Sequence, residues 1–182
     1  MTDPLFYCEH CDYIGSEGLF HMRGEHPTEW ENRPMPRHEI TRRIEFDAGH
    51  RVYGHESKCA HVHGHRYQVL ITCRPANNLD KLGRVVDFGV IKEKVGKFID
   101  DSLDHGMLLF RDDPLREVWV SEFDQYSAVD AQKYYIMDDN PTAENIAKLI
   151  YLKACELLKD YGIKMVKVTV FETPNCQSSY SE

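Results

Sequence analysis

The order of periodic segments after residue 38 is the feature that most constrains the fold. Apolar alternation predicts strands, and apolar residues at helical spacing predict amphipathic helices. The segments are, in chain order, a strand ending at His50, a strand over 66–73, a helix over 86–103, an irregular insertion over 111–133, a short strand over 134–136, a helix between Thr142 and Gly162, and a strand over 164–171. Because strands and helices do not alternate regularly, this order predicts an α+β domain rather than a doubly wound parallel sheet.

The composition limits the class of protein. The 182 residues are 42% hydrophobic, an ordinary share for a globular protein with one main domain and a small appendage. Pro34 and Pro36 cannot continue a helix or a sheet ladder, so we predict a small module with a linker over 1–36 and a main domain over 37–182. No run approaches the about 18 apolar residues of a spanning helix, and no basic-then-apolar leader opens the sequence. We therefore expect a cytoplasmic protein that does not enter membranes.

The first 36 residues contain a candidate zinc site. Cys8 and Cys11 are separated by two residues, and His21 and His26 by four. Two thiolates and two imidazoles can complete a tetrahedral structural zinc site, although His10 lies within the cysteine pair as a competitor. The alternative is a pair of reduced surface cysteines with unrelated histidines. We predict a zinc-finger-like module.

Zinc in this module does not imply binding to nucleic acid. Nine residues separate Cys11 from His21, whereas nucleic-acid-reading fingers have roughly twelve. The module contains seven acidic and two basic side chains, so its formal balance of −5 accounts for most of the chain's −8. A phosphate-binding module carries the opposite sign. We expect the metal to stabilise a segment too small to fold alone, with no nucleic-acid partner.

A second histidine cluster lies in the main domain. His63 and His65 point to the same face of a strand, and Gly64 between them permits a bend or a close approach. His50 ends the preceding strand, so three imidazoles can converge if the two strands are neighbours. Three neutral nitrogen ligands without a fourth protein group are typical of a catalytic zinc site with an open position, and Cys59 lies nearby in the sequence. The alternative is a histidine-rich surface turn.

Six motifs follow one another along the main domain. They are Phe46-Asp47-Ala48-Gly49-His50-Arg51, Lys58-Cys59-x3-His63-Gly64-His65-x-Tyr67, Val86-Asp87-Phe88, Leu103-Asp104-His105, Pro141-Thr142-Ala143-Glu144-Asn145 and Glu172-Thr173-Pro174. In type and order they resemble the family of 6-pyruvoyltetrahydropterin and 6-carboxytetrahydropterin synthases. The resemblance implies a tunnelling fold (T-fold), in which an antiparallel sheet carries two helices on one face. It also implies a homo-oligomer, hexameric or tetrameric, whose subunits form a barrel with active sites between them.

The resemblance also implies roles for individual residues. It makes His50, His63 and His65 the ligands of a catalytic zinc and Cys59 the catalytic thiol, whose thiolate the charge of the metal would favour. It makes Asp104 and His105 a proton-transfer pair and Glu172 the anchor for the pterin ring. Thr142 is a helix cap that can also contact the pterin. Each role suits the chemistry of the side chain, because imidazoles and thiols exchange protons near neutral pH and a carboxylate can accept two N–H bonds from a guanidine-like ring edge.

Further candidates surround this set. Asp87 could orient a ligand histidine through a hydrogen bond. A triphosphate substrate needs cations, and the candidates are Lys58, Arg66, Lys81 and Arg84, with the possibility that a neighbouring subunit supplies them.

The spacing between Cys59 and His63 separates members of the family. Three intervening residues resemble the 6-carboxytetrahydropterin synthases of 7-deazaguanine (queuosine-type) biosynthesis, whereas five would resemble the animal-type pyruvoyl enzymes. The implied reaction converts 7,8-dihydroneopterin triphosphate into 6-carboxy-5,6,7,8-tetrahydropterin with release of triphosphate and acetaldehyde. The alternatives are a 6-pyruvoyltetrahydropterin synthase and a non-catalytic zinc-finger binding module on a T-fold scaffold. The presence of all the implied catalytic residues disfavours the scaffold.

Overall fold

The computed structural model describes residues 6–8, 13–15, 38–123 and 132–182. The chain divides into two compact units, residues 1–37 and 38–182. In the first unit, strands β1 (Phe6–Cys8) and β2 (Tyr13–Gly15) pair antiparallel. The candidate ligands Cys11, His21 and His26 lie outside the described residues, as does the side chain of Cys8, so the zinc-finger-like module stays a prediction.

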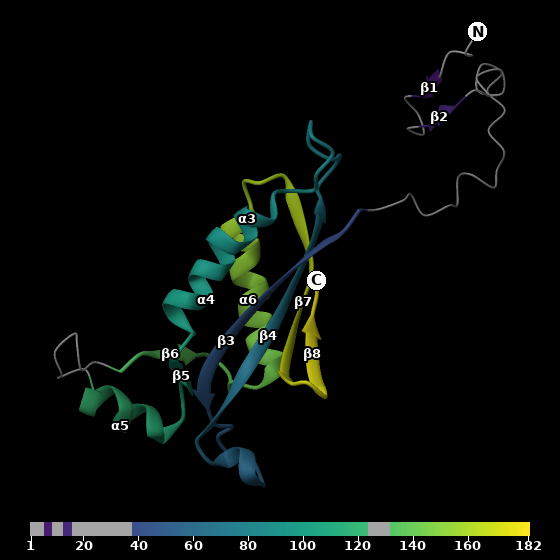
Figure 1. Cartoon of the computed structure of the whole chain (residues 1–182). Helices are drawn as coiled ribbons and strands as arrows, with labels where there is room; N and C mark the ends of the chain where they lie inside the picture. Colours follow the sequence, from purple (N-terminus) through teal and green to yellow (C-terminus); the bar gives the residue numbers. More distant parts are fainter. Residues whose placement is uncertain (1–5, 9–12, 16–37, 124–131) are drawn as a thin grey trace. The chain divides into compact units, whose positions relative to one another are not determined.

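A six-stranded mixed sheet forms the second unit, with the strand order β6-β5-β3-β4-β7-β8 (Figure 1). The strands are β3 (Ile40–His50), β4 (His63–Pro75), β5 (Gly106–Phe110), β6 (Tyr134–Met137), β7 (Ile163–Thr173) and β8 (Cys176–Tyr180). β3, β4, β7 and β8 pair antiparallel, whereas β5 runs parallel to β3 and β6 runs parallel to β5. The predicted antiparallel sheet is therefore confirmed for four strands and wrong for the two at the β6 end.

Two long helical segments cover one face of this sheet, as predicted (Figure 1). The first is continuous and consists of α3 (Phe88–Ile91), a π-helical turn η2 (Lys92–Gly96) and α4 (Lys97–Ser102). The second is α6 (Ala143–Leu158), whose first turn is capped by Thr142. No helix of the described residues is long and apolar enough to cross a membrane.

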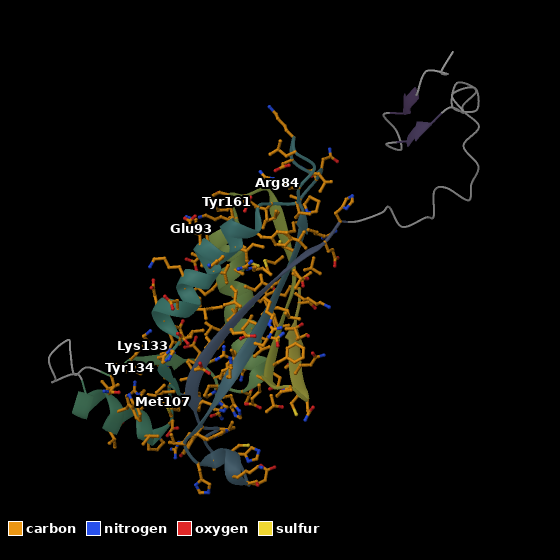
Figure 2. The ribbon with its side chains drawn as sticks, viewed as in Figure 1. Arg84, Glu93, Met107, Lys133, Tyr134 and Tyr161 are labelled. Atoms are coloured by element: carbon orange, nitrogen blue, oxygen red, sulfur yellow. The ribbon has the colours of Figure 1, made fainter. Side chains whose placement is uncertain are left out.

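The core lies between the helices and the covered face of the sheet (Figure 2). Alternation along β3 and β4 directs Phe46, Tyr67 and Val69 into it, and Ile91 and Ile146 meet them from the helices; all five are at most 2% exposed. Burying an apolar side chain such as Phe46, Val69 or Ile91 stabilises the fold by roughly 1.5–3 kcal/mol. The core thus fixes the two central strands whose ends carry the histidine cluster.

Among the strands and α-helices of the second unit, three were not predicted from the sequence: β5, β8 and the helix α5 (Pro114–Phe123), which lies in the segment predicted to be irregular. α5 begins at a capping residue, because the Asp113 carboxylate accepts a hydrogen bond from the Leu115 amide at 2.8 Å. The same carboxylate receives Nε of Arg51 at 2.7 Å and its Nη2 in a second bond. Asp113 therefore links α5 to the residue that follows His50.

Candidate active site

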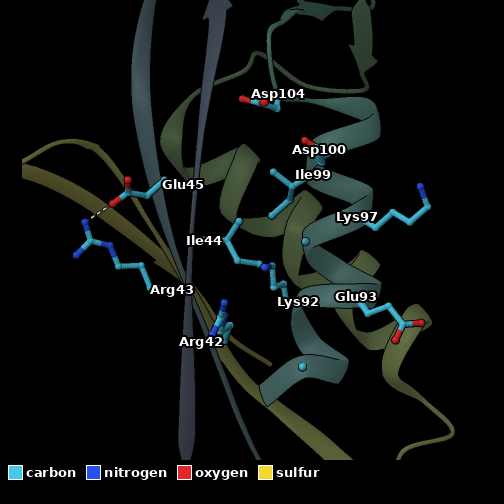
Figure 3. A pocket seen from close by; sticks show the side chains of 12 residues that line it. Arg42, Arg43, Ile44, Glu45, Lys92, Glu93, Lys97, Ile99, Asp100 and Asp104 are labelled. Carbon is cyan, nitrogen blue, oxygen red and sulfur yellow. Dashed lines mark hydrogen bonds and ion pairs between the residues drawn. The ribbon is translucent and has the colours of Figure 1, made fainter. Parts of the chain in front are cut away.

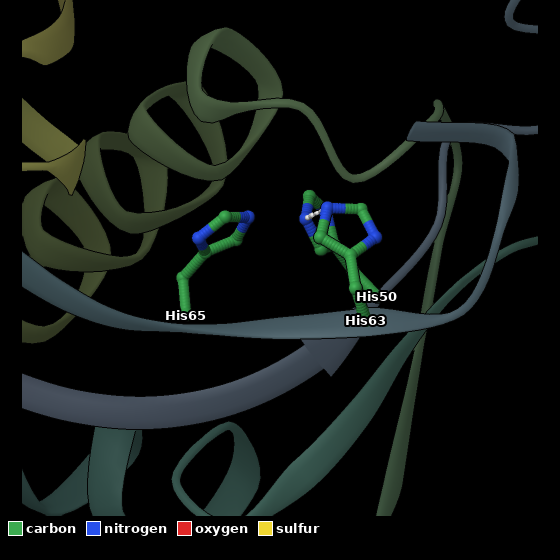
Figure 4. Close-up of side chains that lie close together, drawn as sticks. All are labelled: His50, His63 and His65. Carbon is green, nitrogen blue, oxygen red and sulfur yellow. Dashed lines mark hydrogen bonds between the residues drawn. The ribbon is translucent and has the colours of Figure 1, made fainter. Parts of the chain in front are cut away.

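Three histidines meet at one end of the sheet, on the face covered by the helices (Figure 4). The register pairs His50 with His63 and Ala48 with His65, which brings the ends of β3 and β4 together. One ligand nitrogen from each of the three rings lies within 4.8 Å of the others. Gly64 between them keeps this approach free of crowding, because a Cβ at this position would lie 3.1 Å from the Ala48 carbonyl oxygen, a tight contact.

Backbone carbonyls orient two of these rings. His50 Nδ1 lies 2.6 Å from the Pro141 oxygen, and His63 Nδ1 lies 2.8 Å from the His61 oxygen. Because a carbonyl oxygen only accepts hydrogen bonds, each Nδ1 carries the hydrogen and each Nε2 keeps a free lone pair. The Nε2 atoms of His50 and His63 then face each other at 3.1 Å with no hydrogen between them.

This donor set fits a zinc ion. Two nitrogens on one tetrahedral zinc lie about 3.3 Å apart, given Zn–N bonds of about 2.0–2.1 Å, close to the separation of His50 Nε2 and His63 Nε2. His65 contributes a buried Nε2 that has no hydrogen-bond partner in the part of the chain that the structure describes. A metal ion would give all three Nε2 atoms a partner, and the neutral imidazole is the form that binds metals.

Burial keeps two of these imidazoles neutral. It lowers the pKa of His50, although the bond to the Pro141 carbonyl and the charge of Glu172 raise it in part. Burial also lowers the pKa of His65, again against the effect of Glu172. Both side chains are therefore ready to bind a cation at neutral pH without first losing a proton.

These lowered pKa values predict how the metal-free protein responds to acid. Below pH 6.5, the ordinary pKa of histidine, the unfolded chain takes up protons at His50 and His65 that the folded chain resists. Each such group lowers the free energy of unfolding by up to about 1.4 kcal/mol per pH unit. We expect the Tm of protein stripped with a chelator to fall from pH 7.5 to 5.5, and His65→Gln to fall less steeply. A Tm that is constant or rises toward pH 5.5 would contradict this account.

Glu172 lies beside the histidines at the end of β7. Its Oε1 is 3.4 Å from His50 Nε2 and 3.6 Å from His65 Nε2, and its side chain is 28% exposed. The structure therefore brings the residue predicted as a pterin anchor to the candidate metal centre. A carboxylate here can accept N–H bonds from a ligand held next to the metal.

Thr142 and Cys59 lie on segments that connect to the same centre. Thr142 caps α6, its hydroxyl accepting from the Asn145 amide at 3.4 Å, directly after the Pro141 carbonyl that orients His50. Cys59 lies in a 3₁₀ turn, η1 (Lys58–Ala60), on the loop that runs from His50 to His63. It is a free, half-buried cysteine, and its carbonyl accepts a hydrogen bond from the Val52 amide at 2.8 Å.

Asp104 and His105 form a hydrogen-bonded pair before β5. His105 Nδ1 lies 2.8 Å from Asp104 Oδ2, while Asp104 Oδ1 accepts from the Asp47 amide at 2.8 Å and the Asp47 carbonyl accepts from the His105 amide at 2.6 Å. The turn holds His105 at a φ of 55°, in the left-handed region that non-glycine residues seldom adopt. Burial raises the pKa of Asp104, but the bonds from Asp47 and His105 outweigh it, so that pKa is lowered overall and Asp104 is ionised.

Within one chain His105 does not share a face with the three histidines. His105 is 77% exposed and borders an open hollow of about 490 Å³ that also reaches Ala48, His65 and Gly106. The rest of its lining is Asp47, Gly49, Gly64 and Arg66. These four residues alternate along β3 and β4 with the cluster histidines, so they belong to the opposite face of the sheet. The structure thus separates two groups that the resemblance places in one active site.

Asp87 does not orient a ligand histidine, which corrects the prediction. Its Oδ1 accepts the Gly89 amide at 2.7 Å as the cap of α3, and its Oδ2 pairs with Arg84 at 2.9 Å. The actual partners of His50 and His63 are the backbone carbonyls of Pro141 and His61. Because every residue has a backbone carbonyl, the sequence cannot indicate which carbonyl will bind a histidine ring.

The four candidate cations occupy different places. Lys81 and Arg84 follow the far end of β4, whose 13 residues span about 40 Å, and Figure 2 shows Arg84 at the opposite end of the unit from Met107, which pairs with Gly49. Arg66 pairs with Glu45 at 3.0 Å on the face that bears His105. Of the four, Lys58 in the Cys59 turn lies on the loop that joins two of the cluster histidines.

A larger hollow, of about 750 Å³, lies between β3 and the α3–α4 segment (Figure 3). It contains none of the three histidines. Its charged lining is balanced, four basic side chains facing four acidic ones: Arg42, Arg43, Lys92 and Lys97 against Glu45, Glu93, Asp100 and Asp104. Because this balance does not attract a polyphosphate, we place the candidate site at the histidines rather than here.

Comparison with known proteins shows the family of the chain. Residues 39–182 match the family model described as 6-pyruvoyl tetrahydropterin synthase. The chain is 45% identical over 139 residues to the 6-carboxy-5,6,7,8-tetrahydropterin synthase of Rickettsia felis, covering 76% of this chain and 96% of the relative. It is 29% identical over 163 residues to the protein of the same name from Aquifex aeolicus, covering 79% and 98%.

Solved structures share the fold. An uncharacterized protein from Wolinella succinogenes superposes with a TM-score of 0.70 at 22% identity, covering 80% of this chain and 98% of that one. The 6-pyruvoyl tetrahydropterin synthase of Plasmodium vivax superposes with a TM-score of 0.59 at 21% identity, covering 81% and 98%. The predicted T-fold of the main domain is thereby confirmed.

Proposed function

The chain belongs to the 6-pyruvoyl tetrahydropterin synthase family, and on that premise we propose that this enzyme, a lyase, is a zinc-dependent 6-carboxy-5,6,7,8-tetrahydropterin synthase. Its substrate is 7,8-dihydroneopterin triphosphate, and its other products are triphosphate and acetaldehyde. The observation that carries the proposal is the convergence of His50, His63 and His65 beside Glu172 in a chain 45% identical to an enzyme of that name. The spacing of three residues between Cys59 and His63 supports the carboxy over the pyruvoyl product.

His50, His63 and His65 would hold the zinc through their Nε2 atoms. When bound, the metal supplies Lewis acidity toward the hydroxyl groups of the substrate side chain. Glu172 accepts N–H bonds from the pterin ring, which places the reacting side chain toward the histidines. Thr142 lies next to the Pro141 turn, where its exposed edge can contact the bound ring.

Two groups move protons in this proposal. Cys59, on the loop between two metal ligands, removes a proton from the substrate side chain. His105, held by the ionised Asp104, transfers a second proton. Lys58 offers a cation for the triphosphate from the turn that carries Cys59.

The active site is proposed to form between subunits of a homo-oligomer, a hexamer or a tetramer. Two observations support this. His105 opens on the face opposite the histidines, so a second copy is needed to unite them, and β3 has a free edge. β5 pairs with β3 only at Ala48–His50, which leaves Ile40–Asp47 without a strand on that side within the described residues. Such an edge can accept a strand of another subunit.

The identity of the pterin product tests the proposed function. Zinc-loaded protein incubated with 7,8-dihydroneopterin triphosphate is expected to yield 6-carboxytetrahydropterin, identified by mass spectrometry. Accumulation of the 6-pyruvoyl compound would assign the chain to the other activity of the family. Failure of metal-loaded protein to consume the substrate would refute both activities.

A second, structural zinc is proposed for residues 1–36, bound by Cys8, Cys11, His21 and His26. The acidity of this module argues against nucleic acid as its partner. We expect the metal content, measured by plasma mass spectrometry, to be two zinc ions per full-length chain and one per chain that starts at Arg37. One zinc ion in both proteins would refute the structural site while leaving the catalytic one in place.

The product is proposed to enter 7-deazaguanine biosynthesis of the queuosine type, in the cytoplasm. This assignment rests on the Cys59 to His63 spacing and on the names of the relatives.

A further inference from the structure

The loop that carries Cys59 contains no buried residue, and its anchor in the buried part of the unit is the ion pair of Arg51, at its start, with Asp113. None of residues 51–62 is buried, although the loop starts after the core residue His50 and ends at His63. Apolar packing therefore cannot fix where Cys59 lies, and the position of the thiol depends on hydrogen bonds. Within the loop, the Val52 amide donates to the Cys59 carbonyl at 2.8 Å, and the His55 amide donates to the Val52 carbonyl at 3.2 Å.

Besides Asp113, which binds Arg51, a second side chain from outside the loop holds its first turn. Asn140 Oδ1 accepts from the Tyr53 amide at 2.8 Å, and Asn140 Nδ2 donates to the Tyr53 carbonyl at 3.0 Å. This is the two-bond exchange that paired residues make in an antiparallel sheet, here made by one side chain. Only a carboxamide offers the donor and the acceptor together in this geometry. Tyr53 directly follows Val52, whose amide donates to the Cys59 carbonyl. The two bonds between Asn140 and Tyr53 therefore restrain the neighbouring residue that holds Cys59.

Asn140 is itself fixed to the turn that orients the metal ligand. Its carbonyl accepts from the Thr142 amide at 2.8 Å and from Asn145 Nδ2 at 2.9 Å, which ties it to the first turn of α6. The next residue is Pro141, whose carbonyl accepts from His50 Nδ1. One short turn thus binds a cluster histidine through its backbone and the Cys59 loop through the side chain of Asn140.

We propose that Asn140 is a positioning residue that sets the Cys59 thiol relative to the three-histidine centre. The inference rests on the proposed function for the role of Cys59. It predicts that the two bonds to Tyr53 matter for turnover rather than for metal binding, because the Pro141 carbonyl that orients His50 belongs to the backbone and survives substitution of Asn140.

Two variants and a control separate these effects in the full-length, zinc-loaded protein. Asn140→Ala removes both bonds to Tyr53, whereas Asn140→Asp keeps the acceptor and loses the donor. The control is Asp139→Asn, which replaces a carboxylate by a carboxamide, the opposite of Asn140→Asp. It lies at the adjacent residue, whose side chain is 59% exposed. The readouts are backbone hydrogen exchange over residues 51–62, zinc content, kcat and KM.

For Asn140→Ala we expect hydrogen exchange at Val52 and Tyr53 to accelerate about tenfold. We expect kcat to fall by about tenfold or more, while zinc content is unchanged and KM stays within about threefold because Glu172 is untouched. Asn140→Asp should lie between Asn140→Ala and the wild type, and it carries the comparison if the alanine variant does not fold. Asp139→Asn should match the wild type in all four readouts.

Three results would overturn the inference. They are hydrogen exchange and kcat equal to those of the wild type, loss of zinc together with activity, and a rise in KM at constant kcat. A wild-type protein that forms no product would refute the proposed function instead. In that case the exchange of residues 51–62 would still decide whether Asn140 holds the loop.

Discussion

Replacing Cys59 by alanine lowers kcat by roughly 10²–10⁴-fold, the usual contribution of a group that transfers a proton in the transition state. The zinc content stays the same, because Cys59 lies on the loop between His50 and His63 and is not one of the three converging ligands. The fold also persists, since Cys59 is only half-buried and its hydrogen bond to Val52 uses the backbone carbonyl. The measurement is steady-state turnover together with metal content.

Cys176→Ala is the matched control for this prediction. Cys176 is also a free cysteine, but it is exposed at the start of β8, so its loss should leave turnover unchanged. If Cys59→Ala lost zinc together with activity, Cys59 would be a metal ligand rather than a proton acceptor. If it kept more than about a tenth of the activity, the thiol would not be the catalytic base.

Replacing His63 by alanine weakens zinc binding by more than about a hundredfold. Even the residues that merely orient a metal ligand contribute about 10–100-fold to affinity, and His63 Nε2 itself faces the Nε2 of His50. Turnover should fall with metal occupancy. Competition with a chelator of known affinity measures the zinc dissociation constant, and plasma mass spectrometry measures the occupancy.

His61→Ala is the control that isolates the imidazole of His63. His61 lies two residues earlier in the same segment, and its contribution to the site is the backbone carbonyl that accepts from His63 Nδ1. The substitution keeps this carbonyl, so zinc affinity should stay within about threefold of the wild type. Loss of zinc in His61→Ala with retention in His63→Ala would reverse the assignment of the ligands.

Much of the fold could be predicted because its central strands are covered on one face. Ile44, Phe46 and Ala48 alternate with polar residues, and this period identifies a strand and its buried face without further information. α6 was equally predictable, since Thr142 caps it and apolar residues line one side. The convergence of three imidazoles followed from the same period, once β3 and β4 paired as neighbours.

The elements that were missed lack these signals. The buried run Gly106–Phe110 has no alternation, because β5 is a parallel strand whose first four residues are buried regardless of the face they point to. β8 is an edge strand of largely polar residues, and such a segment resembles a loop in sequence. α5 starts at the Asp113–Pro114 pair, which is a signal for the start of a helix. The residues after it lack a clear apolar period, and for that reason the helix was not predicted.

The candidate site was predictable in its residue types and less so in its partners. The strand period could place His63 and His65 together, but it could not show that His105 opens on the opposite face, because that depends on a turn held by the backbone of Asp47. The carbonyls that orient His50 and His63 leave no trace in the sequence. Asn140 was missed for a related reason, since its role depends on its contact with Tyr53, 87 residues away.

The ratio of acetaldehyde to triphosphate released tests the central claim most directly. A 6-carboxytetrahydropterin synthase releases one acetaldehyde for each triphosphate, because the side chain of the substrate is cleaved in the same reaction that eliminates the triphosphate. We expect zinc-loaded, full-length protein to give a ratio close to one, with both products formed at least about a hundredfold more slowly by Cys59→Ala. Release of triphosphate without acetaldehyde would contradict the proposed carboxy product and point to a pyruvoyl-type reaction.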